Sequence, residues 1–361
     1  MEKQLANIFE KVQAKQRISA DECAILFETR DILSLGKIAN FVREQKNGNR
    51  AYYNINRHIN YSNVCYVGCK FCEFGQPKSS AKAYHMSAED IREAALSAVE
   101  QGATEFHIVG GLHPDLKLDY YEMLLQELKS IAPHVHLKAF TAVEIDYFAR
   151  VNKTSAEDVL RRLIAAGLGS MPGGGAEILN ERIHKLLHPN KMGAERWIEI
   201  HRIAHGLGLR SNATMLYGHV ETAADKLEHL QKIRALQDET GGFQTFIPLS
   251  FVPDNTELSH LPAPTGLQDL QNIAVSRIFL DNFDHIKTYW VMSGIGTAQL
   301  ALNFGADDID GTIMKEKIVH MAGAQTPEGV SVSDLIRLIR EAGREPVERD
   351  TLYNIVSRDA A

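Results

Sequence analysis

The sequence predicts an α/β protein built as a (β/α) TIM-type barrel, complete or partial, with helical extensions at both ends. From residue 52 onward, short β-rich apolar runs alternate with helical patterns in about seven units, which implies parallel strands joined by helical crossovers. Several helical patterns open with a Ser/Thr-x-x-Asp/Glu capping sequence. Glycine and polar residues follow the apolar runs, at the strand ends where such barrels carry their reactive groups.

Residues 1–50 are predicted to form an N-terminal helical extension. Three helical patterns follow one another there, LANIFEKVQAKQ, SADECAILFET and DILSLGKIANFVREQKNG. Cys23 lies on the apolar side of the second pattern, so we expect a buried thiol without a ligand role. The N-terminus lacks the apolar segment of a secretory signal, and no run reaches the about 18 apolar residues of a membrane span. These features predict a cytoplasmic protein without a membrane span.

Residues 51–300 are predicted to form the barrel core, and residues 301–361 to pack on the barrel or close it. Ser87 is an expected helix cap, and Glu144 is expected to end the third strand. The predicted strand runs are YYNINRHINYSNV (52–64), EFHIVGG (105–111), HLKAFTAVEI (136–145), GSMPGGG (169–175), LRSNATMLYG (209–218), FQTFIPLSF (243–251) and HIKTYWVM (285–292).

Composition and charge exclude some classes of partner. Hydrophobic residues make up 44% of the chain and charged residues 24%, an ordinary globular mix that can bury a core. The net charge is −7, and no strong Lys/Arg run is present, so we expect no nucleic-acid partner. In a reducing compartment a disulfide among the clustered cysteines is disfavoured.

Three of the four cysteines, Cys65, Cys69 and Cys72, form a C-x₃-C-x₂-C cluster after the first predicted strand. Structural zinc needs four ligands, and His58 or His85 is a candidate for the fourth. Iron–sulfur clusters are held by cysteine thiolates, and three ligands would leave one iron of a four-iron cluster open. Both kinds of site remain compatible with the spacing.

The cysteine spacing, with Phe71 in the aromatic position before the third cysteine, resembles the radical S-adenosylmethionine (SAM) superfamily. The resemblance implies a 4Fe–4S cluster held by the three cysteines, with the open iron binding SAM. It also implies that the backbone of Gly110 and Gly111 receives the methionine amino group of SAM, and that Glu144 binds the SAM ribose.

A narrower resemblance, to the aminofutalosine synthase family, covers nearly the whole chain. It implies a transferase of menaquinone biosynthesis that adds the 5′-deoxyadenosyl radical of SAM to 3-(1-carboxyvinyloxy)benzoate, with an external electron donor such as flavodoxin or ferredoxin. The expected products are 6-amino-6-deoxyfutalosine, methionine and CO₂ or bicarbonate. The segments that carry the resemblance are NINRHINYSNVC, FHIVGGLHPDL, LKAFTAVEI, PGGGAEI, ERWIEIHRIAHGLGLRSNATMLYGHVET, QDETGGFQTFIPLSF and NFGADDIDGT.

Two alternatives remain open. A related radical SAM enzyme that abstracts hydrogen, such as cyclic dehypoxanthinyl futalosine synthase or a deazaflavin synthase subunit, would share the cofactor but not the reaction. The other alternative is a non-catalytic protein, in which the three cysteines would bind zinc or an iron–sulfur cluster without any radical SAM reaction.

The expected substrate is a dianion, so its pocket requires hydrogen-bond donors or cations. We predict catalytic roles for His58, His113 and Tyr217, with Asn60, Thr214, His219 and Ser250 as further candidates at strand ends. Arg57 and His58 cannot both point inward, because adjacent strand residues face opposite ways.

The glycine run Gly173–Gly175 lacks the Lys-Ser/Thr of a phosphate-binding loop. We predict instead that backbone at Gly174 approaches SAM or substrate, and that Glu177, at an expected helix start, is a further cofactor-binding residue. His107 and His136 are expected to be core or surface residues.

Overall fold

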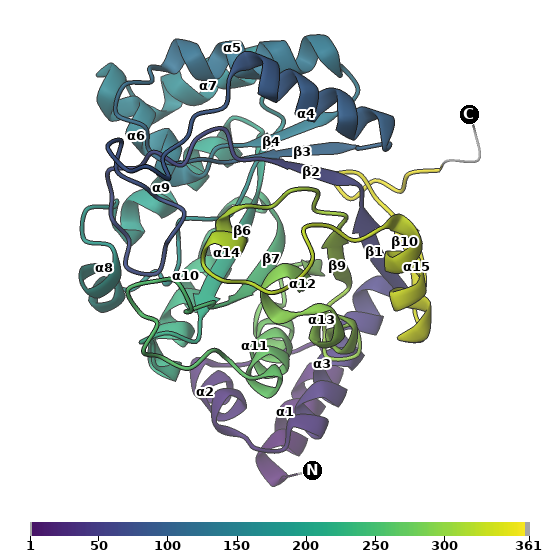
Figure 1. The fold of residues 1–361 in the computed structure, drawn as a ribbon. Helices are drawn as coiled ribbons and strands as arrows, with labels where there is room; N and C mark the ends of the chain where they lie inside the picture. The colour runs from purple at the N-terminus through teal and green to yellow at the C-terminus, as the bar shows by residue number, and fades with distance from the viewer. Residues whose placement is uncertain (1, 358–361) are drawn as a thin grey trace.

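The computed structural model describes residues 2–357, and its main element is a curled sheet of seven parallel strands covered by helices (Figure 1). The strands neighbour one another in chain order, which confirms the predicted fold class. They are β2 (Asn56–Ile59), β3 (Glu105–Ile108), β4 (His136–Ala139), β5 (Ser170–Met171), β6 (Arg210–Tyr217), β7 (Phe243–Ser250) and β8 (His285–Ile286).

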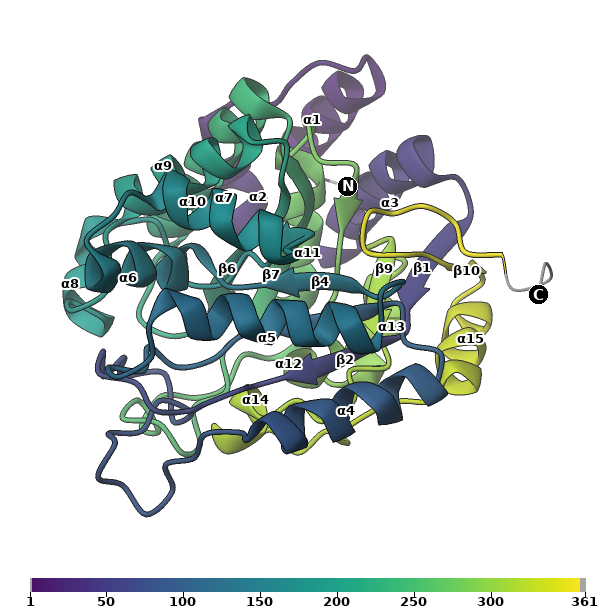
Figure 2. The same cartoon turned by 90° about the horizontal axis from the view of Figure 1, so that it is seen from above.

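Helices connect the successive strands and cover the outside of the sheet (Figures 1 and 2). They are α4 (Ala88–Glu100), α5 (Leu118–Ile131), α6 (Ala142–Asn152), α7 (Ala156–Ala166), α8 (Glu181–Leu187), α9 (Ala194–Gly206), α10 (Ala223–Thr240) and α11 (Gly266–Phe279). Their apolar residues, such as Leu125 and Leu163, are fully buried. The core therefore lies between the strands and the surrounding helices.

A second sheet, of three parallel strands, closes the gap between the two edges of the first. Its order is β10 (Glu345–Glu348), β1 (Arg50–Asn54) and β9 (Asp308–Gly311). On one edge the Asp307 N–H donates to the carbonyl of Ile286 in β8 at 3.0 Å, and on the other the His58 N–H of β2 donates to the carbonyl of Met314 at 3.1 Å. Segment 307–314 thus completes the barrel.

The first three helices pack outside the barrel, on the side opposite α5 and α7 in Figure 1. They are α1 (Lys3–Gln13), α2 (Ala20–Glu28) and α3 (Ile32–Asn47), with α3 lying along α11. Cys23 in α2 is fully buried in the hydrophobic core, as predicted. The remaining helices are α12 (Trp290–Ser293), α13 (Ile295–Ala301), α14 (Ile318–Met321) and α15 (Val332–Glu341). No helix within residues 2–357 is long and apolar enough to cross a membrane.

The predicted strand 52–64 is two strands, β1 and β2, and the predicted strand 285–292 stops at Ile286, before α12. Two predicted site residues also lie in other elements than expected, and local capping explains the first. Glu144 does not end a strand, because β4 stops at Ala139 and Glu144 lies in the first turn of α6. Thr141 and Glu144 form a capping box, with the Thr141 N–H donating to Glu144 Oε2 at 2.7 Å. Glu177 does not start a helix, since α8 begins at Glu181 after the cap Asn180, and Glu177 lies in a loop with φ +47°.

We expect Arg349→Met to lower the free energy of unfolding by about 3–5 kcal/mol, because it leaves the buried Asp308 carboxylate of β9 unpaired. The Arg349 Nε lies 2.6 Å from Asp308 Oδ2, and both side chains are at most 1% exposed. Urea unfolding measures the change. The control Arg337→Met removes a guanidinium from a surface pair with Glu341 and should leave the unfolding curve in place. An unchanged curve for Arg349→Met would contradict the structural role of this pair.

Candidate active site

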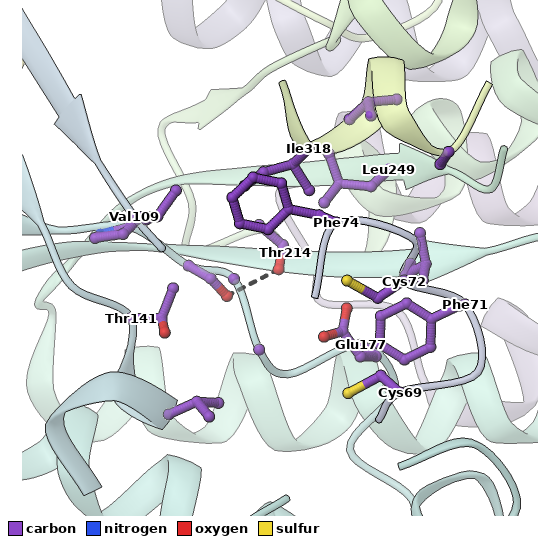
Figure 3. Close-up of a pocket in the computed structure, with 18 of the residues that line it drawn as sticks. Cys69, Phe71, Cys72, Phe74, Val109, Thr141, Glu177, Thr214, Leu249 and Ile318 are labelled. Carbon is purple, nitrogen blue, oxygen red and sulfur yellow. Dashed lines mark hydrogen bonds between the residues drawn. The ribbon is translucent and has the colours of Figure 1, made fainter. Parts of the chain in front are cut away.

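A cavity of about 340 Å³ occupies the inside of the barrel toward the carboxyl ends of the strands (Figure 3). Parallel strands bring their carboxyl ends to one side, so residues distant in sequence meet there. The lining includes ten of the predicted site residues, namely His58, Cys65, Cys69, Phe71, Cys72, Gly110, Gly111, Glu144, Gly174 and Glu177.

The loop between β2 and α4 carries the three cysteines and extends past the end of β2, on the side where α6 and α8 lie (Figure 2). Within it the Cys65 N–H donates to the carbonyl of Gln76 at 2.9 Å, and the Cys72 N–H donates to that of Cys69 at 3.0 Å. In Figure 3 the sulfur atoms of Cys69 and Cys72 point into the cavity, with the Phe71 ring between them. The loop backbone therefore holds the thiols toward one space.

The donor set suits an iron–sulfur cluster. A Cβ atom at Gly75 would lie 3.8 Å from the Cys65 sulfur and 3.9 Å from the Cys72 sulfur, so the missing side chain leaves room beside both thiols. Cys65, Cys69 and Cys72 all line the same cavity, as expected for a cluster in which each cysteine ligates a different iron. Burial raises the pKa of Cys69 to about 12 and that of Cys72 to about 11, so ligation would release protons.

Gly110 and Gly111 follow β3 and pack directly against the cysteine loop. A Cβ atom at Gly110 would lie 2.5 Å from the Tyr61 ring, and one at Gly111 only 2.3 Å from the Val64 carbonyl oxygen. The Gly111 N–H also donates to the carbonyl of Ser62 at 2.8 Å. A side chain at Gly110 would displace the Tyr61 ring, and one at Gly111 would displace the backbone that leads into Cys65.

The Glu144 carboxylate connects α6 to β3 and to the cysteine loop. Its Oε1 accepts from the Tyr61 hydroxyl at 2.9 Å and from the Gly110 N–H at 3.2 Å, while its Oε2 accepts from the N–H and hydroxyl of Thr141. Four donors thus occupy the roughly four acceptor positions of a carboxylate. The SAM-ribose role of Glu144 stays a prediction, and this network gives Glu144 a positioning role as well.

Glu144 makes stability depend on pH. Burial raises its pKa from 4.5 to about 7, against the lowering effect of the Thr141 and Tyr61 hydrogen bonds. The folded state therefore binds more protons than the unfolded state between these values, and stability falls as the pH rises through that window. We expect the free energy of unfolding of wild type, measured relative to Glu144→Gln, to fall by up to about 3 kcal/mol between about pH 5 and pH 8. Parallel pH profiles of the two proteins would contradict this.

A buried ion pair lies next to the cysteines. The Lys191 ammonium contacts the Glu177 carboxylate, and both side chains are largely buried. The same ammonium lies 5.4 Å from the centroid of the Phe71 ring. Both residues line the cavity, so this pair places a cation and an anion beside the space that the thiols border.

Some of the predicted site residues do not line the cavity. Thr214 lines it, with its hydroxyl donating to the Gly173 carbonyl at 2.8 Å. His113 and Tyr217 are not among the lining residues. His113 Nδ1 accepts from the Asp115 N–H at 3.2 Å, and the Tyr217 hydroxyl donates to the buried Asp269 carboxylate at 2.8 Å. Asn60, His219 and Ser250 are not among the lining residues either. Their side chains bond to the carbonyl of Val109, the carbonyl of Leu216 and the Asp269 carboxylate, respectively.

Sequence reasoning missed three lysines and one histidine of the cavity, namely Lys138, Lys191, Lys287 and His107. A usable signal existed for Lys138 and His107, which each stand between two apolar residues inside a short strand segment. A polar residue at such a position is buried whenever its face is the inner one. Lys191 lies in a loop, and no local pattern marks it.

Sequence comparisons match the chain to two family models. The radical SAM superfamily model matches residues 59–233, and the model described as the CofH/MqnC C-terminal region matches residues 240–360. The aminodeoxyfutalosine synthase of Thermus thermophilus is 44% identical over 356 residues, which are 98% of this chain and 96% of the relative. The cyclic dehypoxanthine futalosine synthase of Streptomyces coelicolor is 40% identical, over 97% of this chain and 88% of the relative.

The fold also has counterparts among solved structures. The crystal structure of methylornithine synthase superposes with a TM-score of 0.75 at 17% sequence identity, covering 94% of this chain and 97% of the other. At that identity the likeness concerns the fold alone.

Proposed function

The chain belongs to the radical SAM superfamily, and from this we propose that it is an aminofutalosine synthase. As such it is a transferase that joins the 5′-deoxyadenosyl group of SAM to 3-(1-carboxyvinyloxy)benzoate in menaquinone biosynthesis. The products are 6-amino-6-deoxyfutalosine, methionine and CO₂ or bicarbonate. The observation that carries the proposal is the 44% identity to an aminodeoxyfutalosine synthase over 98% of this chain. The three C-x₃-C-x₂-C cysteines that line a cavity inside a parallel barrel support the radical SAM chemistry.

Cys65, Cys69 and Cys72 would hold a 4Fe–4S cluster and leave one iron for SAM. When bound, the cluster supplies the electron that splits SAM into methionine and the 5′-deoxyadenosyl radical. The backbone of Gly110 and Gly111 would receive the methionine amino group. The other residues proposed to surround SAM are Phe71, Glu144, Gly174 and Glu177.

Apolar side chains form a large part of the cavity wall. Leu216, Ile247 and Leu249 line it from β6 and β7, and Ile318 and Val319 line it from α14. Such a wall protects a reactive carbon radical from side reactions until it meets the substrate. We propose that His58, which lines the cavity, contacts the substrate. His113 and Tyr217 would act only by positioning their neighbours.

Anaerobic incubation with SAM, dithionite and the enolpyruvyl benzoate, followed by mass analysis, tests this function. We expect a product that retains the adenosyl carbon skeleton, formed together with one methionine per turnover. Free 5′-deoxyadenosine as the stoichiometric product would instead assign the chain to the hydrogen-abstracting relatives. Zinc binding without iron uptake on anaerobic reconstitution would contradict both.

We further propose that the electron donor is a small redox protein such as flavodoxin or ferredoxin, and that the enzyme works in the cytoplasm. The donor is tested by replacing dithionite with a reduced flavodoxin and its reductase. Product formation that depends on flavodoxin concentration is the expected result.

A further inference from the structure

The inner end of the cavity is a polar floor, defined here as His58, His107, Lys138, Lys287 and Asp310. His58, His107 and Lys138 are register partners on β2, β3 and β4, so the three side chains face the same way. Lys287 follows β8, and Asp310 lies in β9, the strand that closes the barrel. The polar floor thus includes residues from both edges of the seven-stranded sheet and from the strand that joins those edges.

Apolar residues separate the polar floor from the cysteines. His107 precedes Gly110, which packs against the cysteine loop, and the strand rise of about 3.3 Å per residue places the polar floor roughly 10 Å below that loop. Val109 is the next inward position after His107 on the same side of the chain, and it lines the cavity together with Ile247 and Leu249. Figure 3 shows Val109 and Leu249 at the cavity wall. The distance between the polar floor and the cysteine loop matches the length of one substituted benzene ring. The apolar side chains between them match the apolar faces of such a ring.

Two buried ammonium groups dominate the polar floor. The side chains of Lys138 and Lys287 are 4% and 2% exposed. Lys138 Nζ lies 2.5 Å from Glu105 Oε1, and Lys287 Nζ lies 3.2 Å from Asp310 Oδ1. An ammonium has three N–H donors, so each lysine keeps donors beyond its one ion pair. Buried cations with unused donors at a cavity wall suit an anion that arrives from that cavity.

The carboxylate behind Lys138 belongs to the scaffold. Glu105 stands one inward position deeper than His107 on β3, and its other oxygen accepts from the Thr351 hydroxyl at 2.8 Å. Glu105 is fully buried and is not among the residues that line the cavity. Lys138 therefore lies between a structural carboxylate on one side and the cavity on the other.

The neighbouring groups leave the lysines as the only cations of the polar floor. Burial lowers the pKa of His58 and of His107, so their stacked rings, 4.5 Å apart between centroids, are neutral donors. Burial also lowers the pKa of Lys138, and the nearby charge of Lys287 lowers it further, against the raising effects of the Glu105 and Asp310 carboxylates. An anion placed between the two ammonium groups would relieve their mutual repulsion.

We propose that Lys138 and Lys287 bind the ring carboxylate of the aryl substrate at the polar floor, which leaves the enolpyruvyl end facing the cysteines. This inference rests on the proposed function, which supplies a substrate with a carboxylate at the far end of its ring. It makes the two lysines specificity-determining residues. They select an aryl carboxylate at the end of the molecule that does not react.

The test compares the substrate with 2-phenoxyacrylate, which lacks only the ring carboxylate. Binding of each is measured by anaerobic calorimetry on cluster-loaded enzyme with SAM and without reductant, so that no turnover occurs. We expect wild type to bind the substrate roughly tenfold to hundredfold more tightly than the analogue. In Lys138→Met and in Lys287→Met this ratio should fall toward one while the analogue keeps its affinity.

Lys226→Met is the matched control, because its half-buried ammonium bonds to Asn272 at 3.0 Å outside the cavity. It should keep the wild-type ratio. The double variant Lys138→Met/Glu105→Gln tests the same point without an unpaired buried carboxylate, in case the single variant folds poorly.

A ratio near one in wild type, or an unchanged ratio in the lysine variants, would overturn the polar floor as the carboxylate site. The comparison of substrate and analogue affinities on wild type tests the ring-carboxylate site even if a lysine variant fails to fold. Failure of the proposed function looks different, since wild type would then form no adenosyl adduct from the substrate.

Discussion

Cys69→Ala should yield a folded protein with no 4Fe–4S cluster and no detectable turnover, and Cys65→Ala and Cys72→Ala should do the same. Each thiolate would ligate a different iron, so the loss of one opens a second iron and destabilises the cluster. The three thiols border the same part of the cavity, and no other cysteine lines it. Iron and sulfide content after anaerobic reconstitution, together with adduct formation, measure the effect.

Cys23→Ala is the matched control for these three variants. Its thiol is fully buried within α2 and burial raises its pKa to about 12, so it is an unreactive core residue. The change should cost about 1 kcal/mol of stability and leave the iron content and the turnover unchanged. A catalytically active Cys69→Ala enzyme would refute the cluster assignment, and an iron-free Cys23→Ala protein would show that the iron loss is not specific.

Gly111→Ala should abolish most activity and lower the free energy of unfolding by about 3 kcal/mol. The new Cβ would meet the Val64 carbonyl oxygen at 2.3 Å, and a backbone atom cannot move aside as a flexible side chain can. The strain falls on the residue before Cys65, so the loop that carries the cysteines must shift. Iron retention during gel filtration, urea unfolding and turnover together measure the outcome.

Gly206→Ala provides the control for Gly111→Ala. Gly206 is the last residue of α9, and a Cβ atom there would meet nothing within 4 Å. The substitution should leave iron binding and turnover intact and change stability by at most about 1 kcal/mol in the favourable direction. Equal losses of iron binding and turnover in Gly111→Ala and Gly206→Ala would mean that close packing at Gly111 does not support the cysteine loop.

The features that could be predicted from the sequence are those that short segments specify. The C-x₃-C-x₂-C spacing and the Gly110–Gly111 pair are local, and both segments line the cavity. The alternation of strand runs and capped helices was sufficient to predict a parallel barrel. The capping box at Thr141 is equally local, but the β-rich residues around it favoured a strand, which put Glu144 in the wrong element.

The features that could not be predicted depend on contacts between distant segments. Tyr217 is the last residue of β6, and its hydroxyl donates a hydrogen bond to Asp269 of α11. The residues near Tyr217 in the sequence do not predict this partner. Lys138 and Lys287 belong to the cavity only because the sheet curls and turns one face of each strand inward. The sequence alone also left barrel closure open, because it depends on bridges from segment 307–314 to distant residues next to both edge strands, Arg57 in β2 and Lys287 after β8.

The closing strand has a consequence for how the chain reaches its native state. The Asn56 N–H bonds to the Thr312 hydroxyl across 256 residues, and β1 lies between β9 and β10. A nascent chain emerging from the ribosome cannot complete the ring until almost all of it has been synthesised, so the exposed edges of β2 and β8 persist until then. Contacts of such long sequence separation make folding slow, and we expect truncation before residue 308 to give an aggregating protein rather than a smaller enzyme.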